Sequence, residues 1–266
     1  MLDINLNQIA TDYQRDGYVA GIPILSPDEA MDHRQRLEDA EAKVGSLHYQ
    51  SNVHTILTSP AEIVTDPRVL DIVEKMIGPN ILLHNVTYIT KEAHTESHVS
   101  WHQDLTFWGL SHDDQVTLWL ALSPATEESG CMRMIPGSHM NGVQQHATTN
   151  DDNNVLLQGQ TIQHVDESKA RLAPLAVGEA SFHHGWTMHA SMPNNSDDRR
   201  IGLNVQYLAT HVRQTKHDLD TAILVRGVDD FHHFKPNEFA TSDLDPRALE
   251  RQADLDRLYR KTAGTS

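Results

Sequence analysis

The sequence predicts a mainly β fold in which a closed or double-sheet β core is flanked by α-helices. Two observations predict it. Short runs rich in β-branched residues, separated by turn signals, fill the middle of the chain. Segments with helical spacing of apolar residues and clear helix-start signals lie before and after these runs. This order is typical of a sandwich or barrel that carries helices at both ends.

Residues 1–80 are expected to be mostly helical. The segment Ser26-Pro27-Asp28-Glu29 is a capping box with proline at the first helical position. The helix that it opens should run to residue 43 or 44 and stop at Gly45 in a left-handed conformation. A second helix should begin at Asp66-Pro67 and end at Gly78-Pro79.

Strands are expected from residue 80 onward, where the apolar pattern changes. The runs with strand character are 81–90, 116–122, 132–135, 180–184 and 201–207. The polar stretch from His139 to Gln163 should form a long loop over one face of the core, and it is a candidate lid. A last helix should begin at Asp245-Pro246.

The chain is expected to form a single domain over residues 1–266, since no internal repeat or shift in composition marks a boundary. This domain would consist of an N-terminal helical buttress over about residues 1–80, a β core over about 80–210, and a C-terminal extension whose helix covers about 245–261.

Charge and composition exclude several classes of function. The chain has 37 acidic and 21 basic residues, a net charge of −16, which argues against nucleic acid as a partner. No apolar run approaches the roughly 18–20 residues that span a bilayer, and residues 1–5 show no secretory signal, so a cytoplasmic location is expected. The single cysteine, Cys131, excludes an internal disulfide and cysteine-rich metal sites. The oligomeric state stays open.

Two histidine-containing segments carry the candidate chemistry. His102 and Asp104 stand two positions apart, so in a strand both side chains would project from one face and could bind one ion. A distant segment supplies a further histidine, for which His183, His184 and His189 are the candidates. Two histidines and one carboxylate on one face of a metal leave three positions open. This facial triad is typical of Fe(II) oxygenases, where a bidentate 2-oxo acid and O2 take the open positions.

Four elements in register resemble the phytanoyl-CoA dioxygenase-like branch of the Fe(II)/2-oxoglutarate oxygenases. They are Asp16-Gly17-Tyr18, Trp101 to Asp104, Gly130 to His139, and His189 to Arg200. Their order and spacing match that family over roughly residues 9–210. The resemblance implies a double-stranded β-helix core, also called a jelly roll and similar to the cupins.

The resemblance also implies roles for individual residues. It places the iron ligands at His102, Asp104 and His189. It places at Arg200 the arginine that grips the distal carboxylate of 2-oxoglutarate, a task that suits the planar fork of a guanidinium. The neighbouring Arg199 is the alternative, and the spacing of the family selects Arg200.

Further contacts to the cosubstrate and the substrate are expected beside these residues. Ser191 and Asn85 stand where family members often place additional hydrogen-bond donors to 2-oxoglutarate. Aromatic residues near the metal segment are candidate walls of a substrate pocket. These aromatic residues are Trp101, Phe107 and Trp108.

The activity implied is that of a dioxygenase with Fe(II) as its metal and 2-oxoglutarate and O2 as cosubstrates. Such an enzyme converts 2-oxoglutarate to succinate and CO2 and hydroxylates an unactivated C–H bond. Related halogenases replace the carboxylate ligand by Gly or Ala to make room for chloride. The presence of Asp104 therefore favours hydroxylation, or a desaturating or ring-forming variant, over halogenation.

Two alternatives remain. One is a jelly-roll metalloenzyme that uses another metal, such as Mn or Zn, without 2-oxoglutarate, and the presence of Arg200 argues against it. The other is a relative that binds a ligand without catalysis, and the intact triad argues against that one.

The substrate is expected to be a small polar metabolite, zwitterionic or cationic. The segments 92–98 and 139–166, which should lie near the pocket mouth, contain acidic residues and no lysine or arginine.

Overall fold

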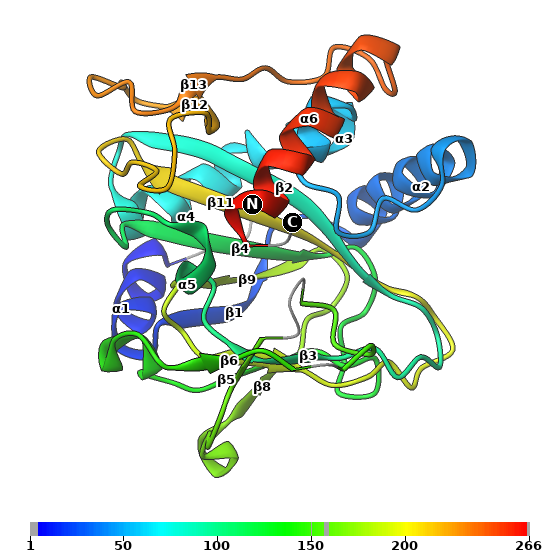
Figure 1. Cartoon of the computed structure of the whole chain (residues 1–266). Coiled ribbons are helices and arrows are strands. Elements are labelled where there is room, and N and C mark those ends of the chain that lie inside the picture. Colours follow the sequence, from blue (N-terminus) through cyan, green and yellow to red (C-terminus); the bar gives the residue numbers. More distant parts are fainter. Residues whose placement is uncertain (1–4, 150, 157–159, 265–266) are drawn as a thin grey trace.

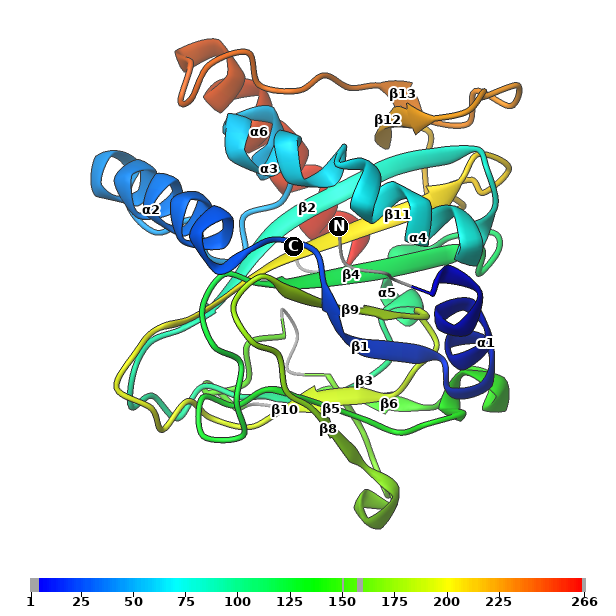
Figure 2. The ribbon, with the colours of Figure 1, turned by 180° about the vertical axis from the view of Figure 1, so that it is seen from behind.

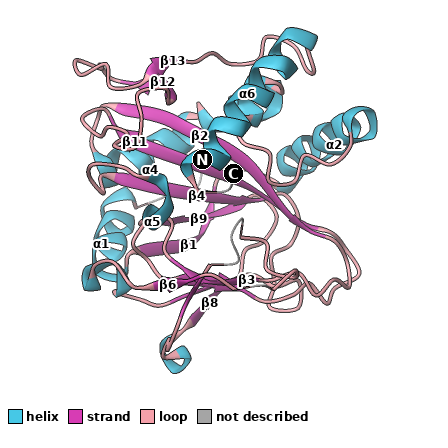
Figure 3. Cartoon of the chain, viewed as in Figure 1, coloured by secondary structure: helices cyan, strands magenta, loops and turns pink. Residues whose placement is uncertain are grey.

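Helices lie before and after the strands of the core, as the sequence predicts (Figures 1 and 3). The computed structural model describes residues 5–149, 151–156 and 160–264. Over these residues the helices are α1 (Leu6–Asp16), α2 (Pro27–Val44), α3 (Thr58–Val64), α4 (Pro67–Ile77), α5 (Leu105–Trp108) and α6 (Pro246–Thr262). The short 3-10 helices are η1 (Val53–Thr55), η2 (Ser138–Asn141) and η3 (Glu167–Lys169). The strands are β1 (Tyr18–Pro23), β2 (Ile81–Lys91), β3 (Val99–His102), β4 (Gln115–Ala121), β5 (Met132–Met134), β6 (His146–Ala147), β7 (Thr161–Ile162), β8 (Arg171–Ala173), β9 (Glu179–His183), β10 (His189–Ser191), β11 (Arg200–Ala209), β12 (Thr221–Arg226) and β13 (Lys235–Pro236).

The capping signals act as predicted in α2 and α4. The Ser26 hydroxyl accepts a hydrogen bond from the Glu29 N–H, and the Glu29 carboxylate accepts one from the Ser26 N–H, which completes the capping box. The Asp66 carboxylate caps α4 by accepting a hydrogen bond from the Arg68 N–H. Helix α2 ends before Gly45, but Gly45 has φ of 84° and ψ of −175°. The predicted left-handed helical conformation is therefore wrong, although a positive φ is present.

Two sheets face each other and form the core (Figures 1 and 2). In the described residues the larger sheet has the order β1-β9-β4-β11-β2-β12-β13 and the smaller one β3-β10-β5-β8. A separate pair is formed by β6 and β7. The pairings are antiparallel except between β12 and β13. Strand β11 pairs along its length with both β2 and β4, so it lies at the centre of the larger sheet.

Successive side chains of β11 point alternately toward the helices and toward the space between the two sheets. Leu203, Val205 and Tyr207 join a buried cluster with residues of α1 to α4, on the outer face of the larger sheet. Asn204 and Gln206, the residues between them, point to the opposite face and line a cavity between the two sheets. The helices thus seal one face of the larger sheet, and the other face is available for a site.

The structure also differs from the sequence prediction in three segments. Strand β1 was not expected among the N-terminal helices, and β12 and β13 extend the larger sheet beyond residue 210. The stretch from His139 to Gln163 is not loop throughout, because η2 overlaps its start and β6 pairs with β7 within it. Residues 150 and 157–159 of that predicted loop lie outside the described residues. No helix in the described part of the chain has the length and apolar character needed to cross a membrane.

Candidate metal centre

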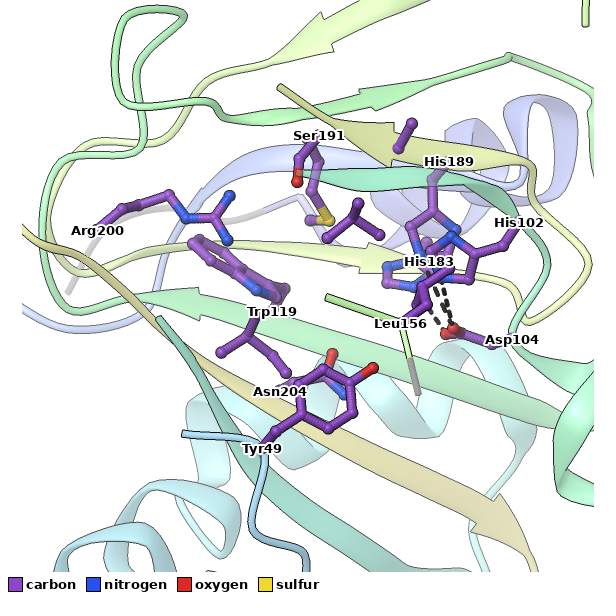
Figure 4. Close-up of a pocket in the computed structure, with 14 residues that line it drawn as sticks. Tyr49, His102, Asp104, Trp119, Leu156, His183, His189, Ser191, Arg200 and Asn204 are labelled. Carbon is purple, nitrogen blue, oxygen red and sulfur yellow. Dashed lines mark hydrogen bonds and ion pairs between the residues drawn. The ribbon is translucent and has the colours of Figure 1, made fainter. Parts of the chain in front are cut away.

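Two neighbouring strands bring His102 and His189 side by side. These residues pair directly across β3 and β10, and their ring centroids are 4.0 Å apart. The Oδ1 atom of Asp104 lies 3.4 Å from Nε2 of His102 and 3.8 Å from Nε2 of His189. The possible ligand atoms of the three side chains all lie within 4.8 Å of one another (Figure 4). The structure therefore brings together the three residues predicted as a triad.

Asp104 reaches the histidines by a different route from the one predicted. Strand β3 ends at His102, and Asp104 has helical angles of φ −58° and ψ −48° at the start of α5. The prediction that His102 and Asp104 project from the same face of one strand is therefore wrong. A turn after His102 directs the Asp104 carboxylate toward the two histidines instead. The buried Gln103 side chain fixes this turn, because its amide donates to the Gly142 and Trp186 carbonyls and accepts from the Gln144 N–H.

The hydrogen bonds of the two histidines leave unprotonated nitrogens facing a carboxylate. Nδ1 of His102 lies 2.9 Å from the Ser100 carbonyl, and Nδ1 of His189 lies 3.0 Å from the Thr187 carbonyl. A carbonyl only accepts, so each Nδ1 carries the proton and each Nε2 presents a lone pair to Asp104. Lone pairs and a carboxylate repel one another unless a cation lies between them, so this donor set fits a divalent metal such as Fe(II).

Electrostatics support an ionised carboxylate beside a neutral imidazole. Burial opposes ionisation of Asp104, but positive charge or hydrogen-bond donation on the side of His189, His102 and His183 holds its pKa well below the usual value. A metal cation between the carboxylate and neutral imidazoles would act in the same direction. Burial, reinforced by His102, holds the pKa of His189 well below its usual value. These are the protonation states that metal binding requires.

The two other candidate histidines of the distal segment lie elsewhere. Nε2 of His183 is 3.2 Å from the second carboxylate oxygen of Asp104, Oδ2. Nε2 of His184 lies 3.9 Å from Oδ2 of Asp113, and its ring lies beside those of Tyr13 and His139. Only His189, of these three, contributes to the converging group among the described residues.

Arg200 lies at the other end of a cavity that begins at the triad (Figure 4). Its side chain is 2% exposed, donates to the Gly130 carbonyl at 2.5 Å, and lies 5.2 Å from the centre of the Trp119 ring. Gly202 makes room for this arrangement, because a Cβ there would stand 2.0 Å from the Trp119 ring. Burial lowers the pKa of Arg200 to about 10, so the group is a cation at neutral pH.

A buried lysine, which could not be singled out from the sequence, lies next to Arg200. Lys91 is 1% exposed, and its ammonium donates to the Ser191 hydroxyl at 2.7 Å and to the Met192 carbonyl. Burial, with the charge of Arg200, lowers the pKa of Lys91 to about 6. No carboxylate of the described chain forms an ion pair with either group, so an incoming anion would meet a buried guanidinium and a buried amine that can regain its proton beside the anion. The position of Lys91 opposite Arg200 could not be read from the sequence without the strand register.

The other predicted cosubstrate residues divide into two groups. Ser191 lines the cavity, and because its oxygen accepts from Lys91, its own proton can be donated into the cavity. Asn85 is buried but does not line the cavity, and its side-chain oxygen accepts from the Asn52 N–H at 2.8 Å. Arg199, the alternative to Arg200, forms ion pairs with Glu41 and Glu92.

The cavity continues past the triad into a second part with a different lining. Aromatic and amide side chains surround it, and apart from Asp104 its described lining contains no charged residue. These side chains are Tyr49, Phe107, Trp108, Asn204, Gln206 and Tyr259. Phe107 and Trp108 were predicted as walls, whereas Trp101 lies under Arg133 instead. From the predicted lid, Leu156 and Gln160 line this part.

Comparison with known proteins gives matches over most of the chain. The family described as Phytanoyl-CoA dioxygenase (PhyH) matches residues 13–202. A probable alpha-ketoglutarate-dependent hypophosphite dioxygenase of Stutzerimonas stutzeri is 31% identical over 165 residues, which cover 61% of this chain and 57% of that protein. The chain therefore spans less than two thirds of that relative. The L-proline trans-4-hydroxylase of Streptomyces griseoviridis is 26% identical over 226 residues, 73% of this chain and 83% of that enzyme.

A solved structure extends the similarity to the whole fold. The apo form of the non-heme monooxygenase ThoJ superposes with a TM-score of 0.84 at 28% identity, and the match covers 96% of this chain and 97% of that one. The facing sheets and flanking helices thus confirm the predicted double-stranded β-helix core.

Proposed function

The chain belongs to the phytanoyl-CoA dioxygenase (PhyH) family of Fe(II)/2-oxoglutarate-dependent oxygenases, and we propose that it hydroxylates an unactivated C–H bond of a small polar metabolite. Its cofactors are Fe(II) and 2-oxoglutarate. The observation that carries the proposal is one continuous cavity with two imidazole lone pairs and a carboxylate at one end and an unpaired buried arginine at the other.

His102, Asp104 and His189 are proposed to hold the iron. When bound, iron with 2-oxoglutarate and O2 supplies the oxidising power for C–H cleavage, with succinate and CO2 as by-products. The carbonyls of Ser100 and Thr187 fix the two imidazoles in the tautomer that binds metal through Nε2. The protein therefore presents three ligands already set in orientation and protonation.

Arg200 and Ser191 are proposed to bind the distal carboxylate of 2-oxoglutarate. The guanidinium is held in place by the Gly130 carbonyl and the Trp119 ring, which leaves further N–H groups to donate. Lys91 orients the Ser191 hydroxyl, and a carboxylate bound beside it would raise the lowered pKa of Lys91 and restore its positive charge. The cations at this end and the metal ligands at the other suit a dicarboxylate with a 2-oxo group that lies between them.

Hydroxylation is proposed rather than halogenation because the position that chloride would take is filled by the Asp104 carboxylate. The L-proline trans-4-hydroxylase among the relatives is consistent with this reaction class. Desaturation and ring formation use the same site, and the mass of the product distinguishes them from hydroxylation.

The substrate is proposed to be a small zwitterionic or cationic metabolite that enters the aromatic part of the cavity. The faces of Tyr49, Phe107, Trp108 and Tyr259 offer cation–π contacts. The absence of lysine and arginine from the described lining of this part disfavours a phosphorylated or polyanionic molecule. Because α6 contributes Tyr259, we propose that the N-terminal helices, β core and C-terminal helix act as one domain.

The experiment that tests the proposed function is a screen of succinate release. Purified protein is loaded with Fe(II) under anaerobic conditions and then exposed to 2-oxoglutarate, O2 and a panel of amines, betaines, amino acids and acyl-CoA thioesters. A substrate-dependent rise in succinate, with a product that has gained one oxygen atom, is expected. A protein that binds Fe(II) but neither binds nor consumes 2-oxoglutarate would contradict the proposal.

A further inference from the structure

The two carboxylate oxygens of Asp104 have different surroundings. Oδ1 faces the Nε2 atoms of His102 and His189, at 3.4 and 3.8 Å. Oδ2 faces the larger sheet, where Oγ1 of Thr117 and Nε2 of His183 each lie 3.2 Å away. The carboxylate is therefore held with one oxygen toward the metal ligands and the other turned away from them.

Thr117 and His183 come from one rung of the larger sheet. They pair directly across β4 and β9, and both are at most 1% exposed. His102 and His189, in contrast, come from the smaller sheet, so the carboxylate of Asp104 lies between the two sheets. The position of the two Oδ2 contacts is thus determined by strand register and not by flexible side chains.

Both contacts to Oδ2 are donors. The Thr117 hydroxyl accepts a hydrogen bond from the Gln115 amide at 2.8 Å, so its own proton is available for Oδ2. No carbonyl of the described chain holds the proton of His183 on Nδ1, as happens in His102 and His189, so Nε2 of His183 can carry the proton and donate it to the carboxylate. No described residue forms a hydrogen bond with Nδ1 of His183, so Oδ2 of Asp104 is the hydrogen-bond partner that its ring has among the described residues.

We propose that Thr117 and His183 are positioning residues that restrict Asp104 to one metal-binding oxygen. This inference rests on the proposed function. A carboxylate that bound the metal through both oxygens would occupy one of the three positions that a facial triad leaves open. Two donors on Oδ2 oppose this second bond, so the positions needed by bidentate 2-oxoglutarate and by O2 stay free.

The contact between Nε2 of His183 and Oδ2 of Asp104 also indicates that His183 positions a ligand and is not itself a metal ligand. Its ring is close to the site, with a centroid 4.5 Å from that of His189, yet its nitrogens do not belong to the converging group of ligand atoms. A protonated Nε2 cannot bind a metal. His183 therefore acts on the metal only through Asp104.

Binding of 2-oxoglutarate to the Co(II)-loaded protein tests the proposal without turnover. Co(II) stands in for Fe(II) because it resists oxidation during calorimetric titration. The variants Thr117→Val and His183→Phe remove one donor each at similar size, whereas Thr117→Ser and His183→Gln keep a donor. Ser181→Ala, a buried change on the same strand as His183, is the matched control, since the Ser181 hydroxyl has no hydrogen-bond partner among the described residues.

The Kd for 2-oxoglutarate should rise at least about tenfold in Thr117→Val and in His183→Phe, at saturating Co(II). It should stay within about threefold of the wild type in Thr117→Ser, His183→Gln and Ser181→Ala. The visible spectrum of bound Co(II) should change in the first two variants only, because the coordination number changes.

Several results would overturn this assignment. An unchanged Kd in both donor-free variants would show that Oδ2 needs no restraint. Loss of all Co(II) binding in His183→Phe, with the thermal stability of the metal-free protein retained, would make His183 a ligand. A wild-type protein that binds no Fe(II), Co(II) or 2-oxoglutarate would instead contradict the proposed function itself.

Discussion

Lys91 lies directly opposite Arg200 across strands β2 and β11, and both side chains are buried. Both groups have lost their hydration, and holding a positive charge on both at once costs free energy unless an anion binds there. The pKa of Lys91 records this cost, since burial and Arg200 lower it to about 6. The pair is therefore the feature of the fold that most directly indicates a bound carboxylate.

Replacing Arg200 by lysine should raise the KM for 2-oxoglutarate at least about tenfold, equal to about 1.4 kcal/mol. Lysine lacks the planar fork and would lose one arm of a charge-assisted pair. Arg199→Lys is the matched control, and it should leave this KM nearly unchanged because Arg199 already pairs with Glu41 and Glu92. An effect confined to Arg199→Lys would move the carboxylate site to that residue.

Binding of 2-oxoglutarate should become weaker as the pH rises above about 6. In the free protein Lys91 loses its proton near that pH, and a carboxylate bound beside it would raise its pKa again. Binding at pH 7.5 should therefore be coupled to the uptake of up to one proton. The affinity for 2-oxoglutarate should then fall by up to about tenfold for each unit that the pH rises. Calorimetry in buffers of different ionisation enthalpy measures this uptake. It should vanish in Lys91→Met, and proton uptake that persists in this variant would assign it to another group.

Acid should destabilise the protein partly through His54. This side chain is fully buried, neither ring nitrogen has a hydrogen-bond partner among the described residues, and burial lowers its pKa to about 3. Below about pH 6.5, His54 binds a proton in the unfolded chain but stays neutral in the folded chain. The free energy of unfolding is therefore at its full value above that pH and falls as the pH is lowered. The His54 contribution to this loss should be about 2 kcal/mol between pH 7 and pH 5.

Urea unfolding of wild type and His54→Leu at the two pH values checks this estimate. The variant should lose less stability on acidification, by about that amount. A residual loss should persist in both proteins, because His48 and His184 also have pKa values lowered, to about 4, by burial. Parallel stability curves for the two proteins would show that His54 does not titrate as its burial implies.

The residues of the candidate triad could be predicted from the sequence, but their route into the site could not. His102 and Asp104 were found by their spacing, yet Asp104 lies in a turn. The turn depends on bonds from Gln103 to residues about forty and eighty positions away, which a local pattern does not contain. Strand β1 could not be predicted for the same reason. It lies between helices in the sequence, and it forms a strand because it pairs with the distant β9.

The supporting residues were harder to predict because their roles depend on strand register. Lys91 is significant only because it faces Arg200 and Ser191, and Thr117 because it faces Asp104. Asn85 shows the reverse, since the family resemblance suggested a contact with the cosubstrate, whereas its side-chain oxygen accepts a hydrogen bond from the Asn52 N–H.

The central claim, that His102, Asp104 and His189 hold one iron, is tested most directly by metal content. Fe(II) bound per chain is measured after anaerobic loading and desalting, in wild type, His189→Ala and His184→Ala. We expect about one iron in wild type and in His184→Ala and almost none in His189→Ala, since two remaining ligands bind the metal weakly. Full iron content in His189→Ala would contradict this assignment and would place the metal on other residues.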